Sequence, residues 1–194
     1  MRILLCTLVL ASVAALSGCN DRAQKRAHAR TADSLAGAVS ALADQLRNVD
    51  TNAIQTMISQ YQVCMAFIDE HVHDTISRNQ ADQLQRLSVA GRQLQAFRKN
   101  RELLLARSSA VVSQLSALGA DAASGSAGVE ELESFIRTER SNAGTFTSLA
   151  VQELELYHSA VKQFGLSLPH VSELVRSYNQ GRWPSVYADS AAAL

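Results

Sequence analysis

The chain has 194 residues, of which 47% are hydrophobic and 19% are charged; this composition is typical of one folded domain and excludes wholesale disorder. Lysine plus arginine and aspartate plus glutamate number 18 each, so no net charge attracts nucleic acid. Both prolines, Pro169 and Pro184, lie near the C-terminus. The long proline-free remainder favours long helices over a turn-rich β protein.

The first eighteen residues have the pattern of a secretory signal peptide. A basic start at Arg2 is followed by an apolar run over residues 3–16, and small residues come next. A run of this length is too short to span the ~30 Å hydrocarbon core of a bilayer as a permanent helix. We therefore expect residues 1–18 to be removed from the mature protein.

The segment ends in Leu16-Ser17-Gly18-Cys19, which resembles the lipobox of bacterial lipoproteins, where a small residue precedes an obligatory cysteine. The resemblance covers only the export segment. It implies cleavage before Cys19, a diacylglyceryl group on the Cys19 sulfur, and an acyl chain such as palmitate on the new amine. Two or three chains anchor a protein permanently, because each buried CH₂ contributes ~0.8 kcal/mol. An ordinary signal peptide with a chance cysteine, or a buried apolar helix, is the alternative.

The same resemblance implies a location in the cell envelope, lipid-anchored and facing the periplasm. In enterobacteria an aspartate directly after the lipidated cysteine favours the inner membrane. Here the following residue is Asn20, so the outer membrane is favoured. Cys6 would leave with the signal and Cys19 would be acylated, which leaves Cys64 as the one free thiol and allows no intrachain disulfide.

Residues 19–30 are interpreted as a lipidated basic tether. Four cations stand against the single acidic Asp21 in this segment, namely Arg22, Lys25, Arg26 and Arg30. One interpretation is a solvated linker. The other is a basic collar in contact with anionic lipid headgroups, a contact that contributes ~1 kcal/mol per cation near a charged surface.

Apolar residues recur three and four positions apart in four segments, which predicts helices over residues 31–48, 52–76, 80–118 and 129–164. Small and polar residues over 119–128 predict a loop. We expect Gly165 to end the fourth helix and Pro169 to open a short fifth one. Strand patterns are absent, so the prediction is an all-α fold: an up-down antiparallel helical bundle of about four helices over residues 31–180, with a short C-terminal helix and a flexible tail over 181–194.

Signatures of common enzymes are missing from the sequence. It contains no G-x-S-x-G, no Walker loop, no H-E-x-x-H and no C-x-x-C. Two E-x-x-H motifs, at Glu70–His73 and Glu155–His158, resemble the ligand pairs of di-iron bundles. However, Glu70 and His73 fall on the side of the predicted helix away from its apolar stripe. The histidines and carboxylates of residues 69–74 favour a solvated acidic patch. A low-affinity metal site is the more specific alternative.

These observations predict a non-enzymatic protein with no cofactor and no resident metal. We expect it to act as a binding or scaffolding module, held to a membrane by its lipid anchor. The apolar helix stripes suit self-association or contact with the helices of a protein partner. The alternative is a ligand- or metal-binding helical-bundle carrier.

Overall fold

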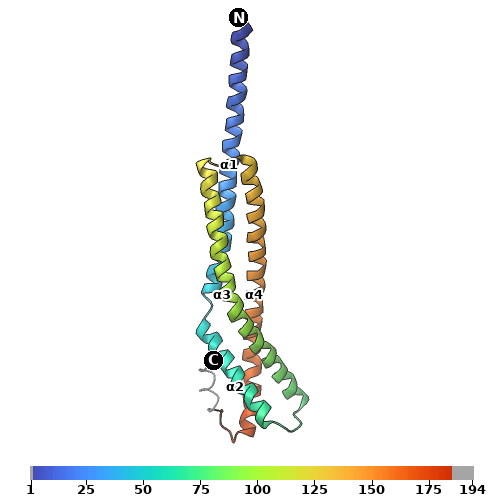
Figure 1. The fold of residues 1–194 in the computed structure, drawn as a ribbon. Coiled ribbons are helices and arrows are strands. Elements are labelled where there is room, and N and C mark those ends of the chain that lie inside the picture. The colour runs from blue at the N-terminus through green and yellow to red at the C-terminus, as the bar shows by residue number, and fades with distance from the viewer. Residues whose placement is uncertain (1, 185–194) are drawn as a thin grey trace. The chain divides into compact units, whose positions relative to one another are not determined.

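The computed structural model describes the backbone of residues 2–184 and the side chains of residues 21–184. Within these residues the chain forms four helices and no strand (Figure 1). The helices are α1 (Arg2–Arg47), α2 (Thr51–His71), α3 (Arg78–Ser124) and α4 (Val129–Tyr178). The predicted all-α helical bundle and its number of long helices are confirmed.

The helices pack in two compact units, and each unit contains three helical segments. Unit 1 contains α1 up to Gln45, α3 from Leu104 and α4 up to Ala150. Unit 2 contains α2, α3 up to Leu103 and α4 from Val151. Therefore α3 and α4 contribute to both units, whereas α1 and α2 contribute mainly to one each.

Helices α1 and α2 lie almost entirely in different units. Helix length gives the physical reason. At 1.5 Å per residue, α2 spans only ~32 Å and α3 spans ~70 Å. A helix as short as α2 leaves much of the apolar stripe of α3 uncovered, and α1 packs against the remainder in unit 1.

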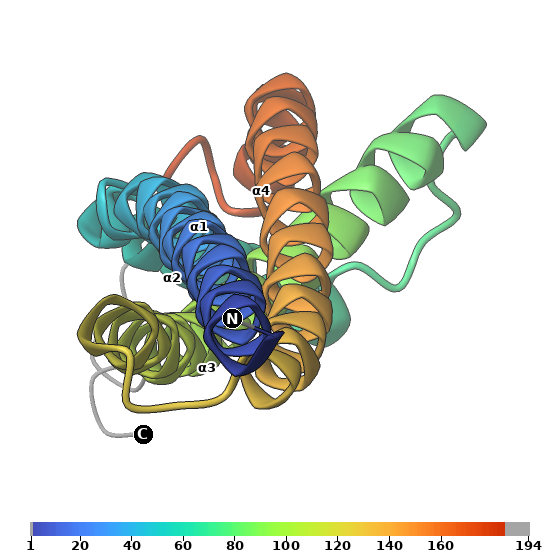
Figure 2. The same ribbon diagram turned by 90° about the horizontal axis from the view of Figure 1, so that it is seen from above.

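The core of unit 1 is built mainly from small and aliphatic side chains. Gly119 of α3 lies so close to α1 that a β-carbon there would stand 3.7 Å from that of Ala32 and 3.3 Å from a carboxylate oxygen of Asp33. Gly119 lies beside Ala32 and Gly125 beside Lys25, so α1 and α3 run antiparallel, and Figure 2 shows α1, α3 and α4 side by side. The buried side chains include Ala32, Val39, Ala43, Leu115, Leu118, Ala122, Leu132, Ile136 and Phe146.

The core of unit 2 contains larger side chains. Phe97 of α3 stacks on Tyr157 of α4 with ring centroids 4.7 Å apart. Gly91 of α3 lies directly against the ring of Tyr61 of α2. The buried side chains include Ile54, Ile58, Cys64, Phe67, Leu87, Leu94, Phe97, Phe164, Val171 and Val175.

The end of α2 and the start of α3 differ from the prediction. α2 ends at His71, five residues before the predicted end at 76. α3 begins at Arg78 because Ser77 and Gln80 cap it: the Gln80 backbone N–H donates to Ser77 Oγ at 3.3 Å, and the Ser77 N–H donates to Gln80 Oε1 at 2.8 Å. This Ser-x-x-Gln capping box was a sequence signal for a helix start, and residues 77–79 form that start instead of a turn between helices.

The predicted loop over 119–128 is shorter in the structure, because α3 continues to Ser124. The added turn contains the buried Ala122 and the alanines beside it, which favour helix. Gly125 then takes a φ of +76°, a left-handed conformation that glycine adopts without steric cost. The loop proper is confined to residues 125–128.

The predicted short C-terminal helix is a continuous part of α4, which passes through Gly165 and Pro169. Proline at 169 removes the N–H that would bond to the carbonyl of Gly165. Burial of Val171 and Val175 beyond it outweighs that loss and holds the helix in place. The helix ends at Tyr178, and beyond it the Gly181 N–H donates to the Arg176 carbonyl at 2.8 Å. Most of the predicted flexible tail, residues 185–194, lies outside the described residues.

Candidate membrane-surface site and a groove in unit 2

The segment predicted as a tether is helical throughout. Residues 19–30 belong to α1, which continues without a break to Arg47. The side chain of Cys19 lies outside those that the structure describes, so its lipidation remains a prediction. The alanines at 23, 27 and 29 give this segment a high helix propensity, which explains why it does not form an irregular linker.

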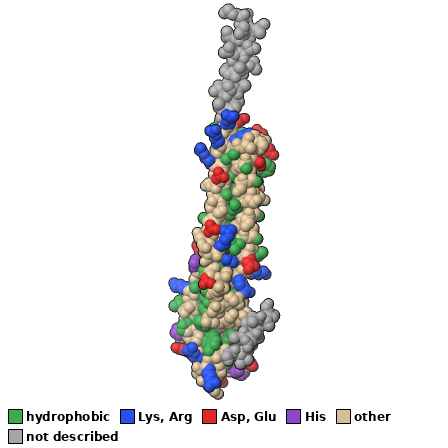
Figure 3. All heavy atoms as spheres, turned by 90° about the vertical axis from the view of Figure 1, so that its left-hand side faces the viewer, with side chains coloured by type: hydrophobic (Ala, Val, Ile, Leu, Met, Phe, Trp, Pro, Cys, Tyr) green, Lys and Arg blue, Asp and Glu red, His purple; other side chains and the backbone are tan. Residues whose placement is uncertain are grey.

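The four predicted membrane-contact residues lie together on α1. Arg22, Arg26 and Arg30 are spaced four residues apart and are exposed, so they share one side of the helix. Lys25 lies beside them and is half-buried, because its Nζ donates to the carbonyl oxygen of Gly125 at 2.9 Å. Figure 3 shows lysine and arginine side chains gathered where the described side chains begin.

The contact between Lys25 and Gly125 joins residues 100 positions apart. It places the basic part of α1 beside the loop between α3 and α4, within unit 1. The left-handed Gly125 ends α3 and leaves carbonyls of the last turn without helical partners, and a lysine is a suitable donor to such a group. Sequence reasoning grouped Lys25 with its neighbours and missed this role.

This end of unit 1 also carries carboxylates. Glu130 and Glu131 occupy the first turn of α4, where they complement the positive end of the helix dipole. Asp121 lies in the last turn of α3 and is exposed. The positive charge is therefore concentrated on α1 alone and does not cover the whole end of the unit.

In unit 2, two polar residues cap consecutive helix ends. Asp50 Oδ1 accepts hydrogen bonds from the backbone N–H groups of Asn52 at 2.9 Å and Ala53 at 3.0 Å, so Asp50 is the N-cap of α2. Arg101 donates from Nε to the Leu46 carbonyl at 2.7 Å. Together with a bond from its Nη2 to the Arg47 carbonyl at 3.2 Å, this contact satisfies the C-terminal carbonyls of α1.

Burial shifts the pKa of two groups in unit 2. It raises the pKa of the buried Cys64 thiol to about 12. Burial, with a smaller effect of the Asp50 charge, also raises the pKa of Tyr157. Both groups are therefore held in their neutral forms at neutral pH, and the high pKa makes Cys64 unreactive as a nucleophile.

The predicted acidic patch at residues 69–74 has no metal-site geometry. Among the side chains that the structure describes, no group of three or more His, Cys, Asp or Glu residues is placed to hold a metal ion. The ring of His71 stacks on Phe67 at 4.4 Å between centroids, and its Nδ1 lies 3.2 Å from the Phe67 carbonyl oxygen. His71 thus contributes to packing at the end of α2.

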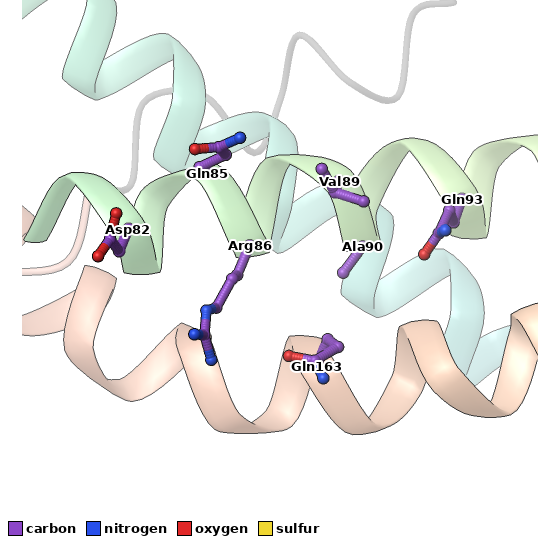
Figure 4. A pocket seen from close by; sticks show the side chains of 7 residues that line it. All are labelled: Asp82, Gln85, Arg86, Val89, Ala90, Gln93 and Gln163. Carbon is purple, nitrogen blue, oxygen red and sulfur yellow. The ribbon is translucent and has the colours of Figure 1, made fainter. Parts of the chain in front are cut away.

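Unit 2 contains an open groove of about 630 Å³ between α3 and α4. Arg86 extends from α3 toward α4 in this groove (Figure 4). A second cavity of about 340 Å³ lies where α3 begins and α4 ends. The first is lined by Asp82, Gln85, Arg86, Val89, Ala90, Gln93 and Gln163, and the second is lined mainly by polar side chains, among them Ser77, Gln80, Gln83, His170 and Glu173.

No protein-family model, no curated protein and no solved structure matches this chain. One helix of the described part, α3, contains a stretch that is long and apolar enough to cross a membrane by length and composition alone, and a third of that stretch is buried in the protein. Function must therefore be argued from the residues and their contacts.

Proposed function

We propose that the protein is a lipid-anchored lipoprotein of the cell envelope, facing the periplasm, that acts as a non-enzymatic binding or scaffolding module. The resemblance of residues 16–19 to a lipobox supports the anchor. One structural observation carries the proposal further: α1 continues as a helix from Cys19 into the core of unit 1. An acylated Cys19 would then be joined to that unit by a stiff helix.

The length of that connection favours contact between the basic residues and the membrane surface. Along a helix with a rise of 1.5 Å per residue, Arg22 lies ~5 Å from Cys19, Arg26 ~10 Å and Arg30 ~17 Å. The Debye screening length at physiological ionic strength is ~8 Å. Arg22 should therefore feel anionic headgroups strongly, Arg26 less strongly, and Arg30 weakly.

Partner contacts are proposed to involve the helix surfaces, with a second copy of the chain or another helical protein as the partner. Several large apolar side chains remain exposed, including Leu103 at 63% and Phe135 at 50%. Such side chains on helices provide the anchors of helix–helix recognition. The outer membrane is the proposed location, and nucleic acid has no place in the proposal because the chain has no net charge.

Metabolic labelling with a palmitate analogue, followed by fractionation of membranes, tests the anchor. The wild-type protein should incorporate label and remain with the membranes. Cys19→Ala should abolish both, whereas Cys64→Ala removes the other cysteine of the mature chain and should change neither. Label that persists in Cys19→Ala, or a cleaved Cys19→Ala protein that stays membrane-bound, would disprove lipid anchoring at this residue.

Protease access to residues 20–30 on anionic vesicles tests the basic collar. Replacing Arg22, Arg26 and Arg30 by glutamine should increase access while the acyl chains keep the protein bound. Lys25→Gln is the matched comparison, because it removes the hydrogen bond to Gly125 and leaves the three exposed arginines in place. If the triple variant is cleaved no faster than wild type on anionic vesicles, the arginines do not contact the headgroups.

The alternative function is a helical-bundle carrier of a small ligand. The observation in its favour is the groove of about 630 Å³ in unit 2, a volume within the usual range of small-molecule sites. Five of its seven lining residues are polar, which distinguishes it from an ordinary apolar gap between helices.

A further inference from the structure

We propose that unit 1 lies tilted on an anionic membrane surface, with the arginine side of α1 toward the lipid and the start of α4 away from it. The inference rests on the proposed lipid anchor and deepens it, because it names the surface that the unit presents to the membrane. The anchor determines only that the protein is held there. The charges at this end of unit 1 determine how the unit is oriented.

The end of unit 1 that contains the α3–α4 loop is polarised in charge. Residues 21–33 of α1 contain four cations and two carboxylates, a net charge of +2. Residues 121–137, which include the end of α3 and the first turns of α4, contain four carboxylates and one cation, a net charge of −3. Figure 3 shows cations mainly on one side and carboxylates mainly on the other where the described side chains begin. The helix dipoles do not change this balance, because the C-terminus of α3 and the N-terminus of α4 meet here with opposite partial charges.

The side of α1 that would meet the lipid carries its three exposed arginines, Arg22, Arg26 and Arg30. The contacts of α1 with α3 lie on a different side. Lys25 donates to the Gly125 carbonyl at 2.9 Å and Ala32 faces Gly119, and these two residues of α1 are two helical turns apart and share a side. A tilt toward the arginines therefore moves the α3–α4 loop and the start of α4 away from the membrane.

An upright unit would instead bring carboxylates close to anionic headgroups. Lys25 lies ~9 Å along α1 from Cys19, and its hydrogen bond to Gly125 places the α3–α4 loop at the same height. Glu130 and Glu131 follow this loop directly and are exposed. With a Debye length of ~8 Å the headgroups would repel them, whereas the more distant arginine at position 30 would gain little. Tilting toward the arginines reverses both effects.

The proposed anchor permits this tilt. Acyl chains attached to Cys19 hold that residue at the membrane through rotatable single bonds and do not fix an angle. α1 continues as one helix from Cys19 into unit 1, so the unit follows the direction of α1. Because the charges of the two sides nearly cancel, this end contributes orientation more than affinity, and the acyl chains supply the affinity.

Phe135 favours the opposite tilt. It is 50% exposed on α4 and would gain from contact with lipid. However, Glu131 lies one turn before Phe135 on the same side of α4, and Glu133 is also exposed. Contact of Phe135 with an anionic surface would bring these carboxylates to the headgroups. We therefore expect charge to outweigh this single apolar side chain, which leaves Phe135 facing water and open to the proposed partner.

Energy transfer from a labelled residue to an acceptor dye on the lipid headgroups tests the tilt. In the acylated Cys64→Ala chain no thiol remains, so a fluorophore can be attached at Ser34→Cys on α1 or at Ser134→Cys on α4, two exposed positions. In an upright unit these labels lie at similar heights, ~22 Å and ~18 Å from the level of Cys19. The surfaces are preformed vesicles of phosphatidylcholine, with or without one third phosphatidylglycerol.

On anionic vesicles the label at 34 should transfer at least twofold more efficiently than the label at 134. The two efficiencies should become similar on neutral vesicles, and also on anionic vesicles in about 1 M salt, where the Debye length is ~3 Å. Replacing the three arginines by glutamine should remove the difference, and Glu130→Gln/Glu131→Gln should reduce it. Glu155→Gln is the matched control, because Glu155 is exposed but lies ~40 Å along α4 from the loop, and it should leave the difference unchanged.

Two results on anionic vesicles would overturn the inference. One is equal transfer from the two labels. The other is more transfer from the label at 134, which would mean that Phe135 and not the charges sets the orientation. Flotation of the same samples with the vesicles reports the anchor separately. A chain that does not float lacks the proposed anchor, and the tilt is then refuted with it; a chain that floats without the difference keeps the anchor and refutes the tilt alone.

Discussion

The contact between Gly91 and Tyr61 gives the sharpest test of the packing in unit 2. A β-carbon at residue 91 would lie 2.3 Å from Cγ of the Tyr61 ring and 2.5 Å from one of its Cδ atoms. These distances are far below van der Waals contact, and Cγ is next to the backbone, so the ring or a helix must move. Overpacking of this kind costs about 1–3 kcal/mol.

Gly91→Ala also has a favourable effect, because alanine is better than glycine in a helix interior by about 0.8–1.0 kcal/mol. Gly165→Ala in α4 of the same unit isolates that effect, since nothing lies within 4 Å of the position that a β-carbon would take there. We expect Gly165→Ala to be stabilised and Gly91→Ala to fall below it by about 1–3 kcal/mol. At this chain length that difference is about 2–4 °C in Tm for each kcal/mol.

Thermal and urea unfolding, followed by circular dichroism, measure both variants. The double variant Tyr61→Ala/Gly91→Ala completes a cycle: removal of the ring should reverse the penalty of Gly91→Ala, so the coupling between the two sites should be at least 1 kcal/mol in magnitude, as is usual for residues in direct contact (about 0.5–3 kcal/mol). If Gly91→Ala is stabilised as much as Gly165→Ala, the close approach of α2 and α3 is incorrect.

Three further substitutions test the helix ends and the buried thiol. Asp50→Ala should reduce the free energy of unfolding by about 0.5–2 kcal/mol through loss of the α2 N-cap, with Asp50→Asn largely restoring it in urea melts. Arg101→Met keeps the apolar stem but leaves the Leu46 carbonyl unpaired, and we expect a loss of about 1–3 kcal/mol; a neutral result would contradict the capping role. Burial raises the pKa of Cys64 to about 12, so the native state favours the neutral thiol. The contribution of this preference to the free energy of unfolding is fully present below pH ~9 and is lost as the pH rises toward 12. The free energy of unfolding should fall with pH by at most ~1.4 kcal/mol per pH unit in this range, and Cys64→Ala should not show this fall. An unchanged fall in Cys64→Ala would show that other groups, such as Tyr157, cause the loss of stability at high pH.

The periodicity of apolar residues was sufficient to predict the helices and much of the core. Val39, Leu46, Ile58 and Cys64 all lie on predicted stripes and are buried. Local signals also placed the start of α2, where Asp50 caps the helix. These features depend on neighbours three or four residues away, and such neighbours are visible in a sequence.

The errors have tertiary causes. Pro169 and Gly165 carry local signals for a helix end, yet the buried Val171 and Val175 hold α4 together across them. The assignment of α1 and α2 to different units depends on how much of α3 each can cover, which is a property of three helix lengths at once. Local propensity does not contain that information.

The candidate sites were predictable to different degrees. A cluster of cations after Cys19 is visible in the sequence, but the hydrogen bond from Lys25 to Gly125 joins positions 100 residues apart and follows only from the packing of α1 on α3. The groove carries no motif at all. Arg86 and Gln163 lie 77 positions apart in sequence, and they line one groove because α3 and α4 pack against each other in unit 2.

The cores of the two units differ in a way that bears on the proposed anchor. Among the described side chains of α1 in unit 1, only Ala32, Val39 and Ala43 are buried to less than 2% exposure, so the helix gains little apolar area per residue at ~25 cal/mol for each Å². Small side chains nevertheless let α1 approach Gly119 closely. The hydrogen bond from Lys25 then holds α1 to the α3–α4 loop six residues after Cys19. A helix with so little buried area benefits from such a contact, because unfolding of this segment would otherwise separate Cys19, the residue proposed to be acylated, from unit 1.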